Sequence, residues 1–132
     1  GPDFGAVEGS NPISAATALV NEKLTFCMHF PIPSEAQNKL REALTTWRIR
    51  CPGSAAVGLA NVAAGRLDGC IEYRSKPWDS AAGHPICRGA GAEFHFIDEP
   101  CFPLKTFSTA MPTYPFRVGS KLFLEETAKA LT

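Results

Sequence analysis

The sequence predicts an α/β fold in which a mixed, mostly parallel sheet is flanked by helices. Short apolar segments alternate along the chain with segments whose apolar residues recur at helical spacing. Proline, glycine or serine marks most changes from one kind of segment to the other. Strands that alternate with helices pair mainly as parallel neighbours, and the helices then cover the sheet. A length of 132 residues fits one domain with its own core.

The amino-terminal region predicts a loop followed by two strands. Residues 1–12 are rich in Gly, Pro, Ser and Asn and predict an irregular leading loop, in which Gly1-Pro2 resembles a protease-cleavage remnant. Residues 13–20 are short and apolar and fit a helix or a strand, of which we favour the strand, and residues 24–30 are interpreted as a second strand. The single domain is therefore expected to span 13–132.

The next element is predicted to be an amphipathic helix over 35–47. Ser34 is a typical residue for a helix N-cap and is followed by an acidic residue in the first turn. Leu40, Leu44 and Trp47 then recur at helical spacing. One apolar face should therefore pack on the sheet.

The middle of the chain predicts a strand, a helix and a second strand. Residues 48–51 form a short strand that ends at a Pro-Gly turn. Ser54 should cap an alanine-rich helix over 55–64, which ends at a glycine. Residues 69–73 form the following strand.

Asp79 is expected to cap a third helix that runs to residue 89. Pro85 lies inside this predicted helix, where it removes a hydrogen bond and predicts a kink or a 3₁₀ turn. The remaining elements are, in order, a strand over 93–97, a proline-rich irregular excursion over 99–115, a brief strand over 116–118 and a final amphipathic helix over 121–131.

Composition excludes several classes of function. The formal net charge is zero, which argues against a nucleic-acid polymer or a polybasic membrane contact as partner. No apolar run is long enough to span a membrane, and we find no secretory signal. The five cysteines show no Cys-x-x-Cys spacing, so we expect reduced thiols and a cytoplasmic location. Between positions 48 and 88 the sequence contains six basic and three acidic residues. This excess of positive charge fits either an anionic ligand or a solvated surface.

Four segments carry the chemistry. They are, in order, Gly53-Ser54-Ala55-Ala56, Ala63-Ala64-Gly65-Arg66-Leu67-Asp68-Gly69, Glu72 and Pro77-Trp78-Asp79-Ser80-Ala81-Ala82-Gly83. Backbone N–H groups at the helix start after Gly53 can bind an anion or a hydroxyl. The small residues after Asp79 allow a ligand or a neighbouring strand to approach closely.

The order and spacing of these segments resemble the carboxyl-terminal half of the inositol monophosphatase superfamily, which consists of Mg²⁺-dependent, lithium-sensitive phosphomonoesterases. The resemblance is tight over 53–92 and looser over 13–132. Residues 63–69 are more similar to the inositol monophosphatases themselves. Residues 81–84, 90–92 and 116–118 are more similar to the 3′(2′),5′-bisphosphate nucleotidases, so the branch stays open.

The resemblance implies a role for each site residue. Asp79 would be a ligand to Mg²⁺, Glu72 would contact a substrate hydroxyl, and Gly53, Ser54 and Ala55 would contact the substrate through their backbone. Each residue also has a plainer interpretation. Asp79 can be a helix cap, Glu72 an exposed strand-end acid paired with an arginine, and Ser54 an ordinary N-cap. None of the three histidines is expected to act as a general base.

The sequence also departs from the family. It lacks the upstream Glu and the Asp-Pro-(Ile/Leu)-Asp-Gly-Thr motif that supply most of the metal ligands in these enzymes. One aspartate cannot hold the ions that phosphate hydrolysis needs. The chain is therefore expected to be the carboxyl-terminal domain of a phosphomonoesterase, incomplete for catalysis alone.

That function implies specific partners. They are a small phosphorylated substrate and an amino-terminal family half or a partner protein; a homodimer is also compatible with the sequence. One alternative is a non-catalytic binding or protein-interaction module built on the same fold. Another is a compact enzyme of different chemistry that uses Cys51 or Cys70.

Overall fold

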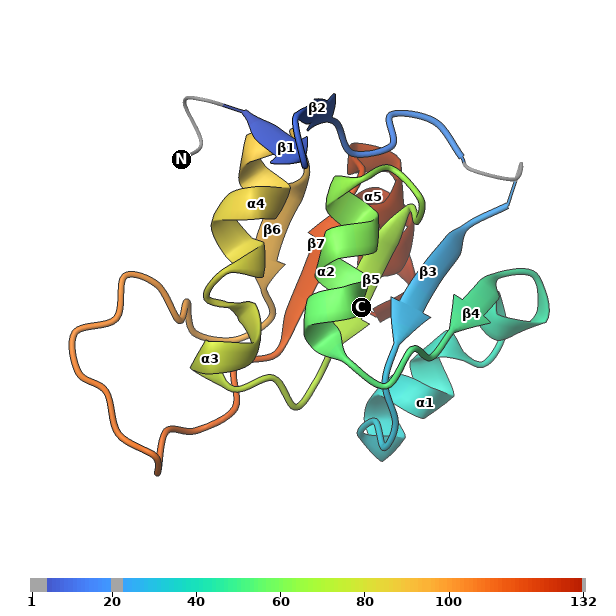
Figure 1. Ribbon diagram of the computed structural model, residues 1–132. Coiled ribbons are helices and arrows are strands. Elements are labelled where there is room, and N and C mark those ends of the chain that lie inside the picture. Colours follow the sequence, from blue (N-terminus) through green and yellow to red (C-terminus); the bar gives the residue numbers. More distant parts are fainter. Residues whose placement is uncertain (1–4, 20–22, 132) are drawn as a thin grey trace.

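A five-stranded mixed sheet forms the centre of the molecule (Figure 1). The computed structural model describes residues 5–19 and 23–131. The strands lie in the spatial order β4 (Arg48–Arg50), β3 (Thr25–Met28), β5 (Gly69–Glu72), β7 (Phe116–Gly119) and β6 (Glu93–Phe96). β3 pairs in parallel with both β4 and β5, whereas β7 is antiparallel to both of its neighbours. Four strands thus run in one direction, which confirms the predicted fold class.

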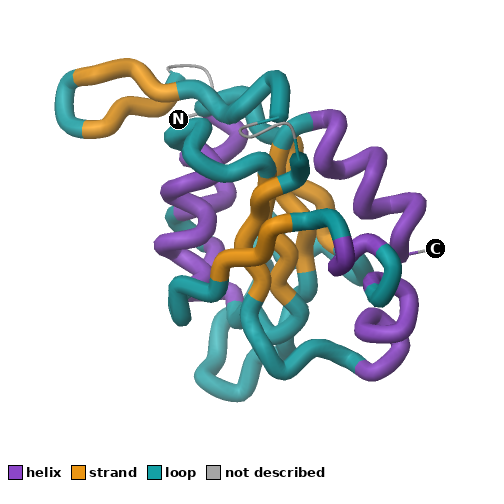
Figure 2. Tube along the Cα trace, turned by 90° about the vertical axis from the view of Figure 1, so that its right-hand side faces the viewer, coloured by secondary structure: helices purple, strands orange, loops and turns teal. Residues whose placement is uncertain are grey.

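Helices cover both faces of the sheet, as the side view in Figure 2 shows. One face carries α2 (Ala55–Ala63), α3 (Pro77–Ser80) and α4 (Gly83–Gly89), and the other carries α1 (Ser34–Leu40) and α5 (Lys121–Leu131). The bounds of α5 are those predicted from the sequence. The described helices include none that is both long and apolar enough to cross a bilayer.

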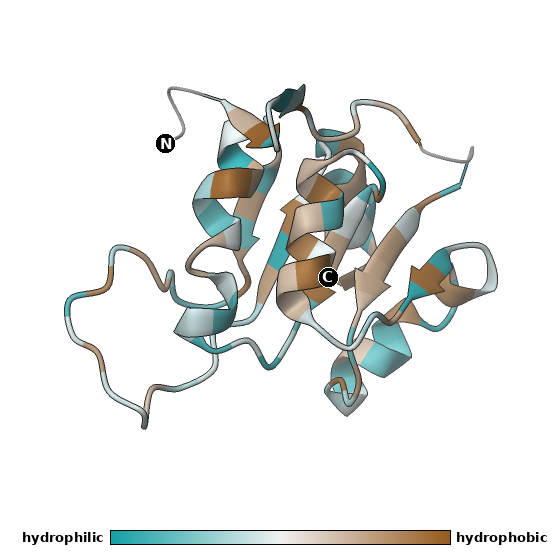
Figure 3. Ribbon diagram, in the orientation of Figure 1, coloured by the Kyte–Doolittle hydropathy of each residue, from teal (hydrophilic) through white to brown (hydrophobic). Residues whose placement is uncertain are grey.

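The core consists of one apolar cluster on each side of the sheet. Because successive side chains of a strand point to opposite faces, Cys27 and Cys70 join the cluster beneath α2 and α4. Phe26 and Ile71 join the cluster beneath α1 and α5, around Phe123. Figure 3 shows hydrophobic residues on the strands and along α2. The alternation expected for a sheet covered on both faces is therefore present.

The amino-terminal prediction was wrong in detail. Residues 6–13 form a small antiparallel hairpin of β1 (Ala6–Glu8) and β2 (Asn11–Ile13) instead of a loop. Gly9 has a φ of +63°, which allows the tight turn between them. The strand predicted over 13–20 is also wrong, because residues 14–19 are irregular and residue 20 lies outside the described residues.

The helix predicted over 35–47 is broken. α1 ends at Leu40, and a short 3₁₀ turn, η2 (Ala43–Thr45), follows before β4. The hydroxyls of Thr45 and Thr46 donate to the carbonyls of Glu42 (2.7 Å) and Ala43 (3.1 Å). These bonds lie beyond the end of α1, within the 3₁₀ turn and at the residue after it, where they compete with regular helix hydrogen bonds.

The helix predicted over 79–89 is two helices, α3 and α4. Gly83 begins α4 and packs so closely on Leu59 of α2 that a Cβ at this position would overlap its side chain. Pro85 is the third residue of α4, in the first turn, where its missing N–H leaves no internal bond unmade. The proline is therefore accommodated by a new helix start and not by a kink.

Candidate functional site

The five site residues predicted from the sequence line a single cavity of about 340 Å³. It lies where β3 and β5 end and where α2 and α3 begin. Its lining residues are His29, Gly53, Ser54, Ala55, Ala56, Glu72, Arg74, Ser75 and Asp79. The carboxyl edge of parallel strands is a common place for ligands in α/β folds. The turn at Gly53, the end of β5 and the start of α3, which are separate in the sequence, thus line the same cavity.

The turn before α2 presents backbone donors to this cavity. Gly53 has a φ of +75°, and a Cβ there would meet open space, so glycine is favoured by the backbone conformation alone. Ser54 is the N-cap of α2, and its hydroxyl accepts a hydrogen bond from the N–H of Val57 (3.4 Å). The first N–H groups of a helix have no partner within it. Ala55 and Ala56 carry two of these groups and line the cavity.

Glu72 is a buried acid whose carboxylate is held at both oxygens. Only 6% of the residue is exposed. Its Oε2 lies 2.6 Å from Nδ1 of His29, and its Oε1 accepts the backbone N–H of Arg74 (3.3 Å). The interpretation of Glu72 as an exposed acid paired with an arginine side chain was wrong. A carboxylate held by two donors still has acceptor capacity for a ligand.

Asp79 is the third residue of α3 and not its N-cap. Its Oδ2 accepts the backbone N–H of Lys76, the residue that does occupy the N-cap position (2.8 Å). No hydrogen bond to Oδ1 is present in the described part of the chain. That oxygen suits a hard cation such as Mg²⁺, which prefers carboxylate oxygens.

A complete metal site needs more ligands than Asp79. Within residues 5–19 and 23–131, no group of three or more His, Cys, Asp or Glu side chains is arranged to hold a metal ion. Among the described residues of this cavity, Asp79 is therefore the one carboxylate with an oxygen available to a Mg²⁺ ion.

His29 is a cavity residue that the sequence did not single out, as are Arg74 and Ser75. It follows β3, whose parallel register with β5 pairs Cys27 with Cys70 and Met28 with Ile71. One further step in that register places His29 beside Glu72. A single histidine after a strand carries no such signal, because the register depends on tertiary packing.

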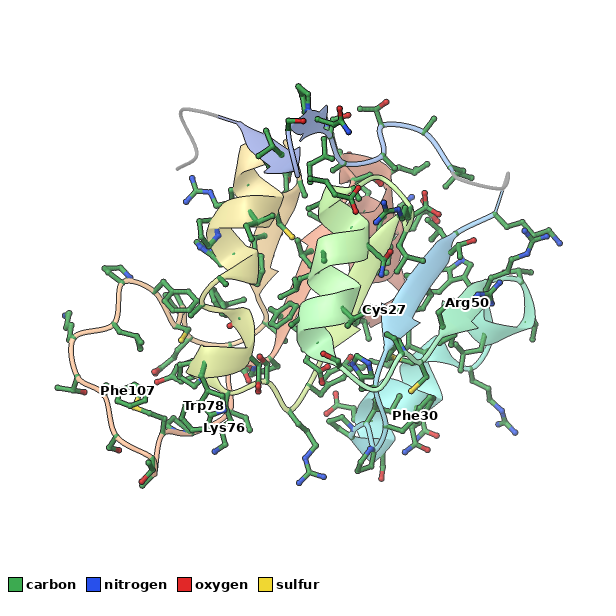
Figure 4. All side chains as sticks on the ribbon, viewed as in Figure 1. Cys27, Phe30, Arg50, Lys76, Trp78 and Phe107 are labelled. Atoms are coloured by element: carbon green, nitrogen blue, oxygen red, sulfur yellow. The ribbon has the colours of Figure 1, made fainter. Side chains whose placement is uncertain are left out.

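The long excursion between β6 and β7 is tied to the segment that carries Asp79. The Nζ of Lys76 donates to the carbonyl of Met111, and the N–H of Tyr114 donates to the carbonyl of Ser75 (2.8 Å). Trp78 and Phe107 meet edge to face, with ring centroids 6.0 Å apart. Figure 4 shows Lys76, Trp78 and Phe107 gathered at this end of the molecule. These contacts fix α3 against the excursion.

Cys70 is not suited to act as a nucleophile. All five are free, and Cys70 is fully buried. A hydrogen bond with Cys27, together with burial, raises the pKa of the Cys70 thiol, and burial raises the pKa of Cys87 to about 12. Thiols in that state are poor nucleophiles. A compact enzyme that uses Cys70 is therefore not supported.

Known proteins match this chain in sequence. The model of the "Inositol monophosphatase family" matches residues 7–131. A fructose-1,6-bisphosphatase/inositol-1-monophosphatase of Aquifex aeolicus is 46% identical over 52 residues, which are 39% of this chain and 20% of that protein.

Solved structures match over nearly the whole chain. The extragenic suppressor protein suhB of Bartonella henselae superposes with a TM-score of 0.78 at 25% identity, over 97% of this chain and 48% of that one. An inositol monophosphatase from Anabaena gives a TM-score of 0.75 at 25% identity, over 97% and 52% of the two chains. The chain thus spans about half the length of these structures.

Proposed function

Because the chain belongs to the inositol monophosphatase family, we propose that it forms the substrate-binding half of a Mg²⁺-dependent phosphomonoesterase, with Asp79 as one metal ligand. Family membership supports a phosphatase-type domain. We further propose that the remaining metal ligands come from an amino-terminal half that this sequence does not contain. The chain alone would then be incomplete for catalysis.

One observation carries the proposal. Asp79, Glu72 and the turn at Gly53 come from three separate segments, and they line the same cavity. Asp79 also bonds to the N-cap residue of α3, but that capping role does not by itself require the other two segments to line the same cavity. Their convergence supports a shared ligand.

The chain's own residues would bind and orient the substrate. The N–H groups of Ala55 and Ala56 donate to a substrate oxygen, and Glu72 accepts a hydrogen bond from a substrate hydroxyl. Asp79 offers its free Oδ1 to the ion. When bound, Mg²⁺ supplies the polarisation of the phosphoryl group and the acidification of a water molecule. Acceptors and donors in one small cavity fit an inositol phosphate, a sugar phosphate or a 3′(2′),5′-nucleotide bisphosphate.

The test is reconstitution of activity. The purified chain is assayed for Mg²⁺-dependent phosphate release from inositol 1-phosphate and adenosine 3′,5′-bisphosphate, with and without the amino-terminal half of a relative such as the Anabaena enzyme. We expect release only in the mixture, inhibition by Li⁺, and loss of release in Asp79→Asn. Arg66→Ala is the matched control, because Arg66 bonds to Glu8 at the exposed surface. Activity of the chain alone, lost in Asp79→Asn, would show that the metal site is not divided.

A second candidate function is a non-catalytic interaction module. Trp78 is 47% exposed and Phe107 is 65% exposed, and the two rings contact each other beside Asp79. Exposed aromatic pairs of this kind are common in protein interfaces. Failure of every amino-terminal half to restore phosphate release, combined with absence of Mg²⁺ binding, would favour this function. The free cysteines fit a reducing compartment such as the cytoplasm in either case.

A further inference from the structure

We propose that His29 is a positioning residue for substrate recognition, which holds the Glu72 carboxylate so that it accepts a hydroxyl of a phosphorylated polyol. The inference rests on the proposed function, because it assigns a role at the same cavity. It adds a residue that the sequence motifs do not contain. It also limits the expected ligands to molecules that present a hydroxyl to Glu72.

The His29–Glu72 pair is short and shielded from water. Nδ1 of His29 lies 2.6 Å from Oε2 of Glu72, and the side chains are 13% and 7% exposed. The two residues are 43 positions apart in sequence. In a shielded site, a hydrogen bond to a carboxylate is stronger than one at the surface.

The direction of this hydrogen bond follows from the surroundings of the ring. An ionised carboxylate can only accept, so Nδ1 of His29 carries the hydrogen and donates it to Oε2 of Glu72. Nε2 of His29 is buried and has no hydrogen-bond partner in the described part of the chain. The Nδ1–H tautomer is therefore the form that the site favours.

Two donors on opposite oxygens fix the plane of the carboxylate. His29 holds Oε2, and the backbone N–H of Arg74 holds Oε1. The position of the backbone N–H donor is fixed by the chain that follows β5. His29 is therefore the donor that a side-chain substitution can remove. A carboxylate fixed in this way can bind a hydroxyl donor, whereas a phosphate group at the same place would meet like charge. Glu72 thus favours a hydroxyl of the ligand over a phosphate group at this position.

The first test needs no ligand. Nitrogen-detected NMR of the full chain at mildly alkaline pH identifies which ring nitrogen of His29 carries the hydrogen. We expect the Nδ1–H tautomer, with a strongly deshielded proton that is lost in Glu72→Gln. An Nε2–H tautomer in the wild-type chain would overturn the proposal, because His29 could not then donate to Glu72.

The second test measures binding of myo-inositol 1-phosphate to the full chain in the presence of Mg²⁺, through amide shifts at 53–56. His29→Ala should weaken binding by roughly tenfold. His29→Asn should largely restore it, because its amide nitrogen can stand near the position of Nδ1, whereas His29→Gln should not. His95→Ala is the matched control, since His95 forms an exposed pair with Glu93.

The outcomes separate this inference from the proposed function. Equal binding by the wild type, His29→Ala and His29→Asn overturns the role of His29 and leaves the cavity as the substrate site. No binding by the wild type, with or without the amino-terminal half, overturns the substrate site and the inference together. If His29→Ala fails to fold, the comparison of His29→Asn with His29→Gln decides the point.

Discussion

Gly69 and Gly119 face each other across β5 and β7, and both lie against the ring of Phe123. A Cβ at Gly119 would overlap the backbone carbonyl of Asp68 and would stand 2.8 Å from the Cα of Gly69. At this point the sheet changes from parallel to antiparallel pairing. The absence of two side chains lets α5 pack directly on the strands that position Glu72.

Gly119→Ala should therefore destabilise the fold strongly. The new methyl group meets backbone, which cannot rotate away, so we expect a loss of about 3 kcal/mol in the free energy of unfolding. Gly91→Ala is the control, because Gly91 has a φ of +86° and open space around it. That change should cost only about 1 kcal/mol. Urea unfolding of both variants measures the difference, and equal losses would refute the packing argument.

Ser54→Asp should separate the N-cap role of residue 54 from the proposed ligand binding at the start of α2. Aspartate is as good an N-cap as serine, so the free energy of unfolding should stay within about 0.5 kcal/mol of the wild type. The added negative charge beside the N–H groups of Ala55 and Ala56 should repel a phosphorylated ligand. Ser54→Ala should do the reverse, with a loss of about 1 kcal/mol in stability and a smaller effect on binding. Unimpaired binding of inositol 1-phosphate by Ser54→Asp would argue against a ligand at this turn.

His84 should titrate below its ordinary range. Burial lowers the pKa of His84 from 6.5, and the positive charge of Arg88 lowers it further. The ring packs against Phe94 and Phe102, with centroids 4.7 and 5.1 Å away. As the pH falls below about 6.5, the unfolded chain takes up the proton first, so stability declines until the pH passes the lower folded value.

NMR titration of the His84 ring checks this prediction. Phe102→Ala should expose the ring to water and move its pKa back toward 6.5. A wild-type pKa at or above 6.5 would be incompatible with the burial described here.

The strongest local signals in the sequence were also the most dependable. Ser54 and Gly65 bracket α2, and the apolar spacing of 121–131 defines α5 without tertiary help. The site residues were predicted as a group because their motif spacing resembles a known family. Their meeting in one cavity then followed from the strand order.

Other features depend on contacts that the sequence does not encode locally. The close fit of Gly83 on Leu59 is a tertiary contact between α4 and α2. The pairing of His29 with Glu72 depends on the register between β3 and β5. Pro85 indicated an interruption of the helix predicted over 79–89, but propensity and periodicity report neither the new helix start at Gly83 nor the pairing of His29 with Glu72.

The most direct test of the proposed metal-ligand role of Asp79 is to locate where a divalent ion binds. Mn²⁺ replaces Mg²⁺ at oxygen sites and broadens nearby NMR signals. With the amino-terminal half present, we predict that broadening centres on Asp79 and reaches Ala55 and Glu72. The chain alone should bind Mn²⁺ at least about 100-fold more weakly, because only one carboxylate ligand remains. Asp79→Asn should abolish the broadening. Broadening centred elsewhere, or unchanged in Asp79→Asn, would contradict the account.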